Sequence, residues 1–414
     1  MLSYKLFMSI LEAHDNNLEP VHTIVPEHFQ EPKYKGTAIS NRSSHSTYGE
    51  HGVLGLDKEI KHAMASGNTF AHKAANKYSN EKFGHDYNFH PEQNSPSSLA
   101  KQYAIAKTFD IAHKDNHAYN TAVYNDYKEH HPEFTHGTND YHGLVEKSYQ
   151  AVAKETNDQF NHIPAKLQFH NGDMNYHNSN ELLRDVHGHN NLTVFKGGDR
   201  HEFLNEVDPK HGINSNEAFR AVHDFYGHSL HGNQFGAKGE ETAWAAHSKM
   251  YSPLAKLAMT SETRGQNSFV NYSGVNTKTQ QSIENHRRLR KAALNSGNIP
   301  LAQTHEHLAR EAGNDWKYAE QKSIILPKEM NRMDYNGEVP HSIAHLLVDK
   351  EAKTNPVYDT KSDKHNLVEL ARHHNTVSHN ATKDAGKFNK ENATSDLHKL
   401  IAVHGYKSLD KNPY

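Results

Sequence analysis

The sequence predicts a mainly α-helical protein with a few short strands, of the α+β class. Apolar residues recur at helical spacing through most of the central part of the chain. Alternating, strand-like runs are confined to residues 165–170 and 191–198. We expect three consecutive segments: a polar N-terminal region that is partly extended with helices over 1–138, a core domain over 139–332, and a polar helical C-terminal tail over 333–414.

The composition explains why only part of the chain is expected to form a dense core. Hydrophobic residues make up 35% of the 414 residues, and the mean hydropathy is −0.93. Both values are low for a single compact globule, so a polar remainder should flank the core. Histidine is abundant, with 37 copies, whereas cysteine is absent. Disulfides, iron–sulfur clusters and thiolate zinc sites are therefore excluded, and any metal must be held by nitrogen and oxygen ligands.

The N-terminal region is expected to hold few packed elements. Residues 2–11 form one short apolar run, which suits a docking helix and is too short to span a bilayer. Residues 15–60 are expected to be an extended loop. Helical patterns follow over 57–80 and 98–128, on either side of a linker at 90–98, and a break is expected at 130–137.

The core segment alternates helical and strand patterns. The sequence predicts helices over 142–160, 178–186 and 214–228, with the two strands between them. Further helices are predicted over 240–262, with a break at Pro253, and over 279–297 and 305–321, before a segment at 323–330 closes the core. In the tail, amphipathic helical patterns occupy 341–352, 364–374 and 394–404.

Candidate functional residues gather in residues 218–274. Titratable side chains lie there among apolar residues that are typical of a core, such as Phe219 and Trp244. Buried polar groups are costly unless they are paired or bound to metal, so this mixture indicates a buried site. The candidates are His223, Asp224, His228, Glu240, Glu241, His247, Glu262 and Arg264.

His223 and His228 are five residues apart, an unusual spacing for two ligands of one ion. On a regular α-helix their side chains point about 140° apart. Both can reach one ion only if the helix tightens, bulges or ends near Gly227, where glycine makes such geometry accessible. The alternative is two unrelated histidines at a helix end.

The segment His223-Asp224-Phe225-Tyr226-Gly227-His228 resembles the His-Glu-Leu-Leu-Gly-His motif of the pterin-dependent aromatic amino acid hydroxylases. In that family the two histidines bind ferrous iron, and a Glu in a Thr-x-Glu context completes the triad. Here Thr260-Ser261-Glu262 places Glu262 34 residues after His228. The resemblance implies the iron ligands His223, His228 and Glu262, and an oxygenase or hydroxylase activity.

This chain departs from the family pattern at three places. Phe219-Arg220 replaces the Pro-Asp that precedes the first histidine, Asp224 replaces a Glu, and Leu257 stands where the family has a Tyr. These departures weigh against pterin use and aromatic hydroxylation more than against metal binding.

A second resemblance covers Tyr141 to Pro327. FRAVHDFYGH, GEETAW and SETRGQNSFVNY look like an uncharacterised family of marine phages and their hosts. It implies a location in the host cytoplasm or in a virion, with other virion proteins as partners, and a structural protein with a degenerate site as one alternative. The net charge of −3 predicts no nucleic-acid partner, and the chain is expected to be soluble, without a membrane. The substrate stays open.

Other ligand sets are possible. Glu240 and His247 share a helical face and could bind metal with His228. A zinc-dependent hydrolase would instead use His223, His228 and a carboxylate, with Glu241 or Asp224 as general base. Glu240 and Glu241 could instead be a charged first helical turn. Asp224 and His247 could orient ligands or relay protons. Arg264 could clamp a substrate carboxylate or pair with Glu241 or Glu262. His170, Asp173 and His177 could hold a second metal, although a solvated loop is the simpler interpretation.

Overall fold

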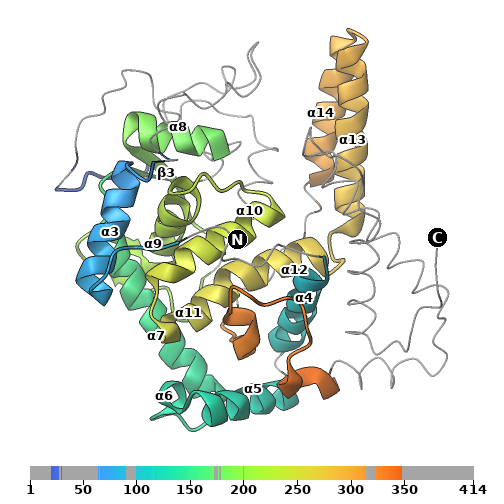
Figure 1. Ribbon diagram of the computed structural model, residues 1–414. Coiled ribbons are helices and arrows are strands. Elements are labelled where there is room, and N and C mark those ends of the chain that lie inside the picture. Colours follow the sequence, from blue (N-terminus) through green and yellow to red (C-terminus); the bar gives the residue numbers. More distant parts are fainter. Residues whose placement is uncertain are drawn as a thin grey trace, which may run out of the picture. The chain divides into compact units, whose positions relative to one another are not determined.

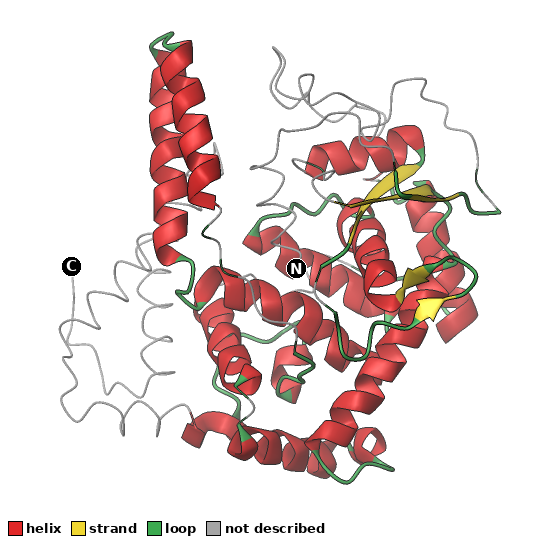
Figure 2. Cartoon of the chain, turned by 180° about the vertical axis from the view of Figure 1, so that it is seen from behind, coloured by secondary structure: helices red, strands yellow, loops and turns green. Residues whose placement is uncertain are grey.

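The computed structural model confirms a mainly α-helical protein with two small sheets (Figures 1 and 2). It describes residues 20–27, 29, 64, 66–89, 99–114, 116–171, 176, 179–198, 200–313, 315, 317 and 322–346. The docking helix expected over 2–11 and the tail helices expected over 364–374 and 394–404 lie outside these residues.

The chain forms two compact units, each built from two separate stretches of sequence. One unit comprises Met1–Glu92 and Val145–Ile324, and the other comprises Gln93–Leu144 and Ile325–Tyr414. All candidate site residues over 218–274 belong to the first unit.

A three-stranded sheet and the helices packed on it build the core of the first unit. Strand β2 (Lys166–Asn171) pairs in parallel with β3 (Asn191–Lys196) and antiparallel with β1 (His22–Ile24). Helix α8 (Ser179–His189) connects the two parallel strands, as such a crossover requires. The other elements of this part are α3 (Phe70–Phe83), α7 (Tyr141–Phe160), which begins in the second unit, and the two-stranded sheet of β4 (Val207–Asp208) and β5 (Ile213–Asn214).

A run of short helical segments follows the sheet and carries the candidate site. Helix α9 begins with a capping box, in which the Asn214 side chain and Glu217 bind each other's backbone N–H. Two segments of the run are π-helical rather than α-helical. The run consists of α9 (Ser215–Val222), η4 (His223–Ser229), α10 (Ala237–His247), η5 (Ser248–Met250), α11 (Pro253–Thr260), η6 (Ser261–Gly265) and α12 (Gln266–Tyr272).

The first unit ends in an antiparallel helical hairpin. Its helices, α13 (Thr277–Asn295) and α14 (Ile299–Gly313), lie side by side in both views (Figures 1 and 2). The second unit contains α4 (Leu99–His113), α5 (His117–His130), α6 (Pro132–Thr135), η7 (Lys328–Asn331) and η8 (His341–Ile343). Within that unit the hydroxyls of Tyr119 and Tyr141 donate to the carbonyl of Ile325.

Several predicted elements agree with the structure, and others differ. The helix expected over 57–80 corresponds to α3, which begins at Phe70 because Thr69 caps its start by accepting from His72 N–H. The helix expected over 98–128 is two helices, because Asn116 accepts hydrogen bonds from the backbone N–H groups of Ala118 and Tyr119 and so caps a new helix. The helix expected from 305 begins earlier, where Asn298 accepts from Leu301 N–H and Pro300 occupies the first turn. Strand β1 lies in the stretch expected to be an extended loop, and its first residue, His22, bonds through its ring to the carbonyl of His211.

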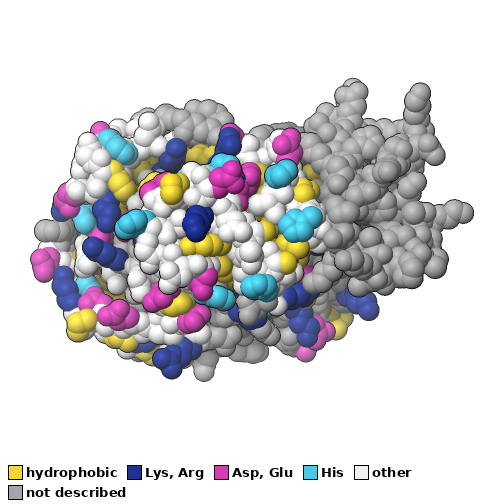
Figure 3. All heavy atoms as spheres, turned by 90° about the horizontal axis from the view of Figure 1, so that it is seen from below, with side chains coloured by type: hydrophobic (Ala, Val, Ile, Leu, Met, Phe, Trp, Pro, Cys, Tyr) yellow, Lys and Arg dark blue, Asp and Glu magenta, His cyan; other side chains and the backbone are white. Residues whose placement is uncertain are grey.

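No described helix is long and apolar enough to cross a bilayer. On the face drawn in Figure 3, cationic, acidic and histidine side chains are intermixed rather than separated by sign. This agrees with the nearly neutral net charge of the whole chain.

Candidate metal centre

The π-helical segment η4 explains how histidines five residues apart can face the same point. Hydrogen bonds in a π-helix join residues five apart, so side chains at that spacing lie nearly above one another. The widened geometry continues past the segment: Leu230 N–H donates to Phe225 C=O at 3.2 Å, and Asn233 N–H donates to His228 C=O at 3.0 Å. Of the three possibilities expected near Gly227, a tighter helix, a bulge or a helix end, the structure has the bulge, and it spans the whole interval from the first histidine to the second.

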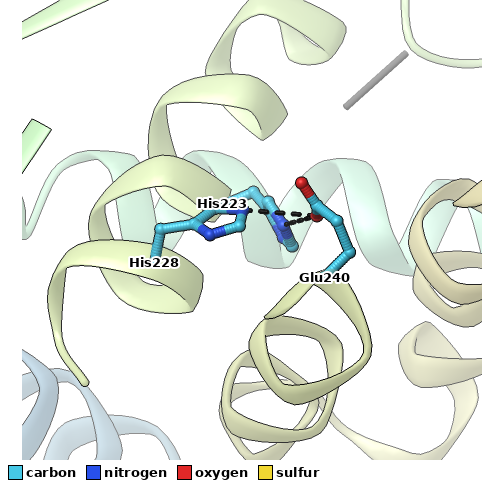
Figure 4. A group of neighbouring side chains, drawn as sticks. All are labelled: His223, His228 and Glu240. Atoms are coloured by element: carbon cyan, nitrogen blue, oxygen red, sulfur yellow. Dashed lines mark ion pairs between the residues drawn. The ribbon is translucent and has the colours of Figure 1, made fainter. Parts of the chain in front are cut away.

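His223 and His228 converge with the carboxylate of Glu240 (Figure 4). The Nε2 atoms of His223 and His228 lie 3.6 and 3.3 Å from Oε2 of Glu240. The three ligand atoms lie within 4.8 Å of one another, and all three residues are buried. Two ligands bound to one ion at about 2.1 Å are about 3.0–3.5 Å apart, so this spacing suits a shared ion.

Two glycines make this convergence possible. A Cβ on Gly227 would lie 3.1 Å from Cε1 of the His223 ring, closer than an ordinary van der Waals contact. A Cβ on Gly239 would lie 1.9 Å from the carbonyl oxygen of Gln234, which no side chain can tolerate. Gly239 therefore allows the loop before α10 to fold against the helix start, directly beside Glu240.

The hydrogen-bond network assigns the proton on each imidazole. Nδ1 of His228 lies 3.1 Å from the backbone carbonyl of Asn233, which can only accept, so Nδ1 carries the proton. In neutral His228 the Nε2 lone pair then faces Glu240. Nε2 of His228 and both carboxylate oxygens of Glu240 are buried and form no hydrogen bond with any described residue. Lone pairs that face one another without a proton between them indicate a site built for a cation.

A chain of side chains fixes His223 in the same tautomer. The amide of Gln159 donates to the carbonyl of Met250, so its oxygen is the acceptor for Nε2–H of His247 at 2.8 Å. Burial lowers the pKa of His247 well below its usual value, and the nearby His223 adds to this effect, so His247 is neutral. Its Nδ1 therefore accepts from Nδ1–H of His223 at 3.3 Å, which leaves the Nε2 lone pair of His223 directed at Glu240.

Glu240 is a carboxylate despite its burial. Burial raises the pKa of its carboxyl group, but positive charge on His228 and His223, with a proton on Nε2, outweighs this effect and lowers the pKa to about 2. A cation bound between neutral histidines would favour the ionised carboxylate in the same way. The three residues thus offer one anionic oxygen ligand, from Glu240, and two neutral nitrogen ligands, from His223 and His228. Such a set suits divalent first-row transition metals.

Glu241 and Arg264 are engaged with each other. The guanidinium donates two hydrogen bonds to the carboxylate, from Nε at 3.0 Å and from Nη2 at 2.6 Å. It also lies 3.8 Å from the centre of the Trp244 ring, and all three side chains are buried. Of the two interpretations of Arg264, the structure shows the ion pair with Glu241 rather than a free clamp for substrate.

Glu262 does not join the two histidines, contrary to the expected triad. Its Oε1 accepts from the hydroxyl of Tyr149 at 2.5 Å and lies 3.2 Å from Nε2 of His201, and its Oε2 accepts from Gln266 at 2.8 Å. Among the described residues, the only group of ligand atoms close enough to share an ion is His223, His228 and Glu240. Glu240, considered above as a helix-start carboxylate or an alternative ligand, takes the place expected of Glu262.

The structure also shows which residues the sequence did not indicate. Gln159 and Tyr149 come from α7, more than sixty residues before the histidines, and nothing in their local pattern marks them.

Asp224 is buried within η4, between the two histidines in sequence. His170 is buried at the end of β2, whereas Asp173 and His177 lie outside the described residues, so a second metal site there stays a prediction.

Comparison with family models, curated proteins and solved structures gave no match. The geometry of the chain itself therefore carries the functional argument.

Proposed function

We propose that this chain is a mononuclear non-haem metal protein whose ion, Fe(II), is held by His223, His228 and Glu240. One observation carries the proposal: three buried ligand atoms from two helices converge within 4.8 Å, and the tautomers assigned above direct both Nε2 lone pairs at the carboxylate. Three protein ligands leave coordination positions open, which is typical of sites that bind and activate oxygen. When bound, the ion would supply that redox chemistry.

The residues of this chain have separate tasks in such a centre. The ion would be bound by His223, His228 and Glu240. Because only Glu240 is charged, a divalent ion and its three protein ligands would together carry one net positive charge. His247 orients the His223 ring through the Nδ1–Nδ1 hydrogen bond. The aromatic rings of Phe219 and Phe235 lie beside the ligands, with ring centres 6.3 Å from His223 and 4.9 Å from His228, and keep water away from the site.

Convergence of Glu240 is also the arrangement that would favour a zinc hydrolase. Such an enzyme needs a carboxylate free to act as general base on metal-bound water. Glu241 is held by Arg264 through two hydrogen bonds, and Glu262 is held by Tyr149 and Gln266. Neither is available for that task, which leaves Asp224, buried within η4, as the general base of the hydrolase alternative. We propose Fe(II) because two histidines and one carboxylate with open coordination positions are typical of non-haem iron oxygenases. Because Glu262 is not in the group, this assignment depends on the ligand set and not on the hydroxylase resemblance.

Elemental analysis of chelator-free protein tests the proposal. We expect about one iron per chain in protein from iron-supplemented cells, oxygen uptake by the reduced protein, and loss of both in His228→Ala. Zinc as the bound ion, with oxygen-independent hydrolysis, would overturn the iron assignment in favour of the hydrolase. Well-folded protein that binds neither ion would overturn the metal centre and favour a structural role.

A further inference from the structure

The interface between the two helices of the hairpin, α13 and α14, contains few large apolar side chains. The residues buried between its helices are small or isolated, namely Ile283, Ala293, Ala302 and Ala309. Two polar pairs also bridge the helices: His286 with His305 at 3.3 Å, and Arg290 with Glu306 at 3.1 Å. Apart from Ile283, no large apolar side chain among the described residues of these two helices is buried.

Those apolar side chains lie on the outside. Among the described residues, every exposed leucine and isoleucine belongs to this hairpin: Leu294, Ile299, Leu301 and Leu308, with exposed fractions of 41%, 51%, 43% and 38%. The first three flank the turn between the helices, where Gly297 adopts a positive φ of 73°. The tip of the hairpin is thus an apolar cap, and a concentration of exposed aliphatic residues marks an interaction site.

The same end of the hairpin is basic. Between Glu284 and Glu306 the sequence contains no acidic residue. Arg290 pairs with Glu306, and Arg288 donates to the side chain of Asn285. Arg287, Arg288 and Lys291 are all exposed on the turns of α13 that lead to the cap. The whole chain has a net charge of −3, so this local excess of positive charge beside the apolar cap favours an anionic partner.

The small size of the cap decides between the partners that could cover it. A specific protein interface buries about 800 Å² on each side, more than three half-exposed aliphatic side chains can offer. A second copy of the same tip would bring like charges together. A bilayer needs no matching surface: its interface accepts a few aliphatic side chains, and anionic headgroups attract the cations around them.

We propose that the hairpin tip docks onto an anionic lipid surface. Leu294, Ile299 and Leu301 would enter the boundary between headgroups and acyl chains, and Arg287, Arg288 and Lys291 would contact headgroup phosphates. This is peripheral binding, consistent with the absence of a membrane-spanning helix among the described residues. The inference is independent of the metal centre.

Vesicle flotation of the full chain tests the proposal. The probes are phosphatidylcholine vesicles with and without 30% phosphatidylglycerol, at low and high salt. We expect binding to the anionic vesicles only. Each cation near the surface contributes about fivefold, so Arg287→Gln/Arg288→Gln/Lys291→Gln should weaken binding by about a hundredfold. Leu294→Ser/Ile299→Ser/Leu301→Ser should remove the binding that persists at high salt.

Matched variants control for general effects of charge and hydrophobicity. Lys128→Gln/Lys154→Gln/Lys210→Gln removes three exposed charges elsewhere, and Val207→Ser removes an exposed apolar side chain. Both should bind as the wild type does. If the triple serine variant fails to fold, Ile299→Ser alone, at the most exposed position of the cap, serves instead. Equal binding by tip and control variants would overturn the proposal. So would failure of the wild type to float, or a concentration-dependent dimer that only the tip variants abolish.

Discussion

Two buried carboxylates in this protein, Glu240 and Glu262, each face histidine, yet their surroundings differ. Nδ1 of His201 accepts N–H groups from Phe203 and Leu204, so its Nε2 carries the proton and donates it to Glu262. At Glu240 the protons of both histidines are on the far side of the rings, at Nδ1. One carboxylate is therefore satisfied by donors, and the other faces lone pairs. The tautomer, more than the presence of histidine, separates a structural carboxylate from a candidate ligand.

The largest expected effect is on metal affinity, and it should separate the two carboxylates when the charge of each is removed in turn. Glu240→Gln should lower metal affinity by at least about a hundredfold, since it removes the only anionic ligand, whereas Glu262→Gln should leave metal content unchanged. Titration of apo protein with metal measures both. Equal losses in the two variants would contradict the assignment of Glu240 as the ligand.

His247 should show an intermediate effect. It touches His223 and not the proposed ion, so His247→Ala should lower metal affinity by about 10–100-fold while the stoichiometry at saturation stays at one. His201→Ala, which removes the histidine at the other carboxylate, is the matched control and should bind metal as the wild type does. A reduced stoichiometry in His247→Ala would instead make His247 a ligand.

The hydrogen bonds that Glu262 accepts should stabilise the folded protein. Tyr149→Phe removes the hydroxyl that donates to this carboxylate and leaves a buried oxygen with fewer donors. We expect the free energy of unfolding to fall by about 1–3 kcal/mol, measured by chemical denaturation of the metal-free protein. Thr242→Ala, which removes an exposed hydroxyl on α10, should change it by much less. A stability unchanged by Tyr149→Phe would show that this contact contributes nothing.

The smallest expected effect is on how the free energy of unfolding depends on pH. Burial raises the pKa of Glu262, but His201 and Tyr149 lower it overall, below the usual 4.5. A carboxyl group whose pKa is lowered by folding stabilises the protein above its ordinary pKa and loses that contribution as pH falls below it. Stability should therefore decline below about pH 4.5, and less steeply in Glu262→Gln. Identical slopes in the two proteins would contradict this interpretation.

Much of the fold could be predicted because its signals are local. The helix over 142–160 and the strand over 165–170 follow directly from apolar spacing, and both match the structure closely. The division at Asn116 was missed because the helical pattern continues across it, and only the capping side chain marks the new start. Strand β1 could not be predicted, because its pairing with β2 joins residues far apart in the sequence.

The candidate site was predictable in part for the same reason. The two histidines and the need for a distorted helix near Gly227 follow from spacing alone, and the structure contains that distortion. The choice between Glu240 and Glu262 depends on which side chains from α7 reach each carboxylate. Tyr149 reaches Glu262 across 113 residues of sequence, so no local pattern could reveal that this carboxylate is already engaged.

The π-helical turn also affects how such a pair of ligands can be recognised in a sequence. A π-turn closes its hydrogen bonds across five residues, one more than the four of an α-turn. On an α-helix, ligands four apart share a face, and on this π-segment ligands five apart do so. An α-helix with two histidines four apart would thus present a similar pair of ligands. A motif search restricted to the α-helical spacing would overlook this chain, whereas one that allows both spacings would include it.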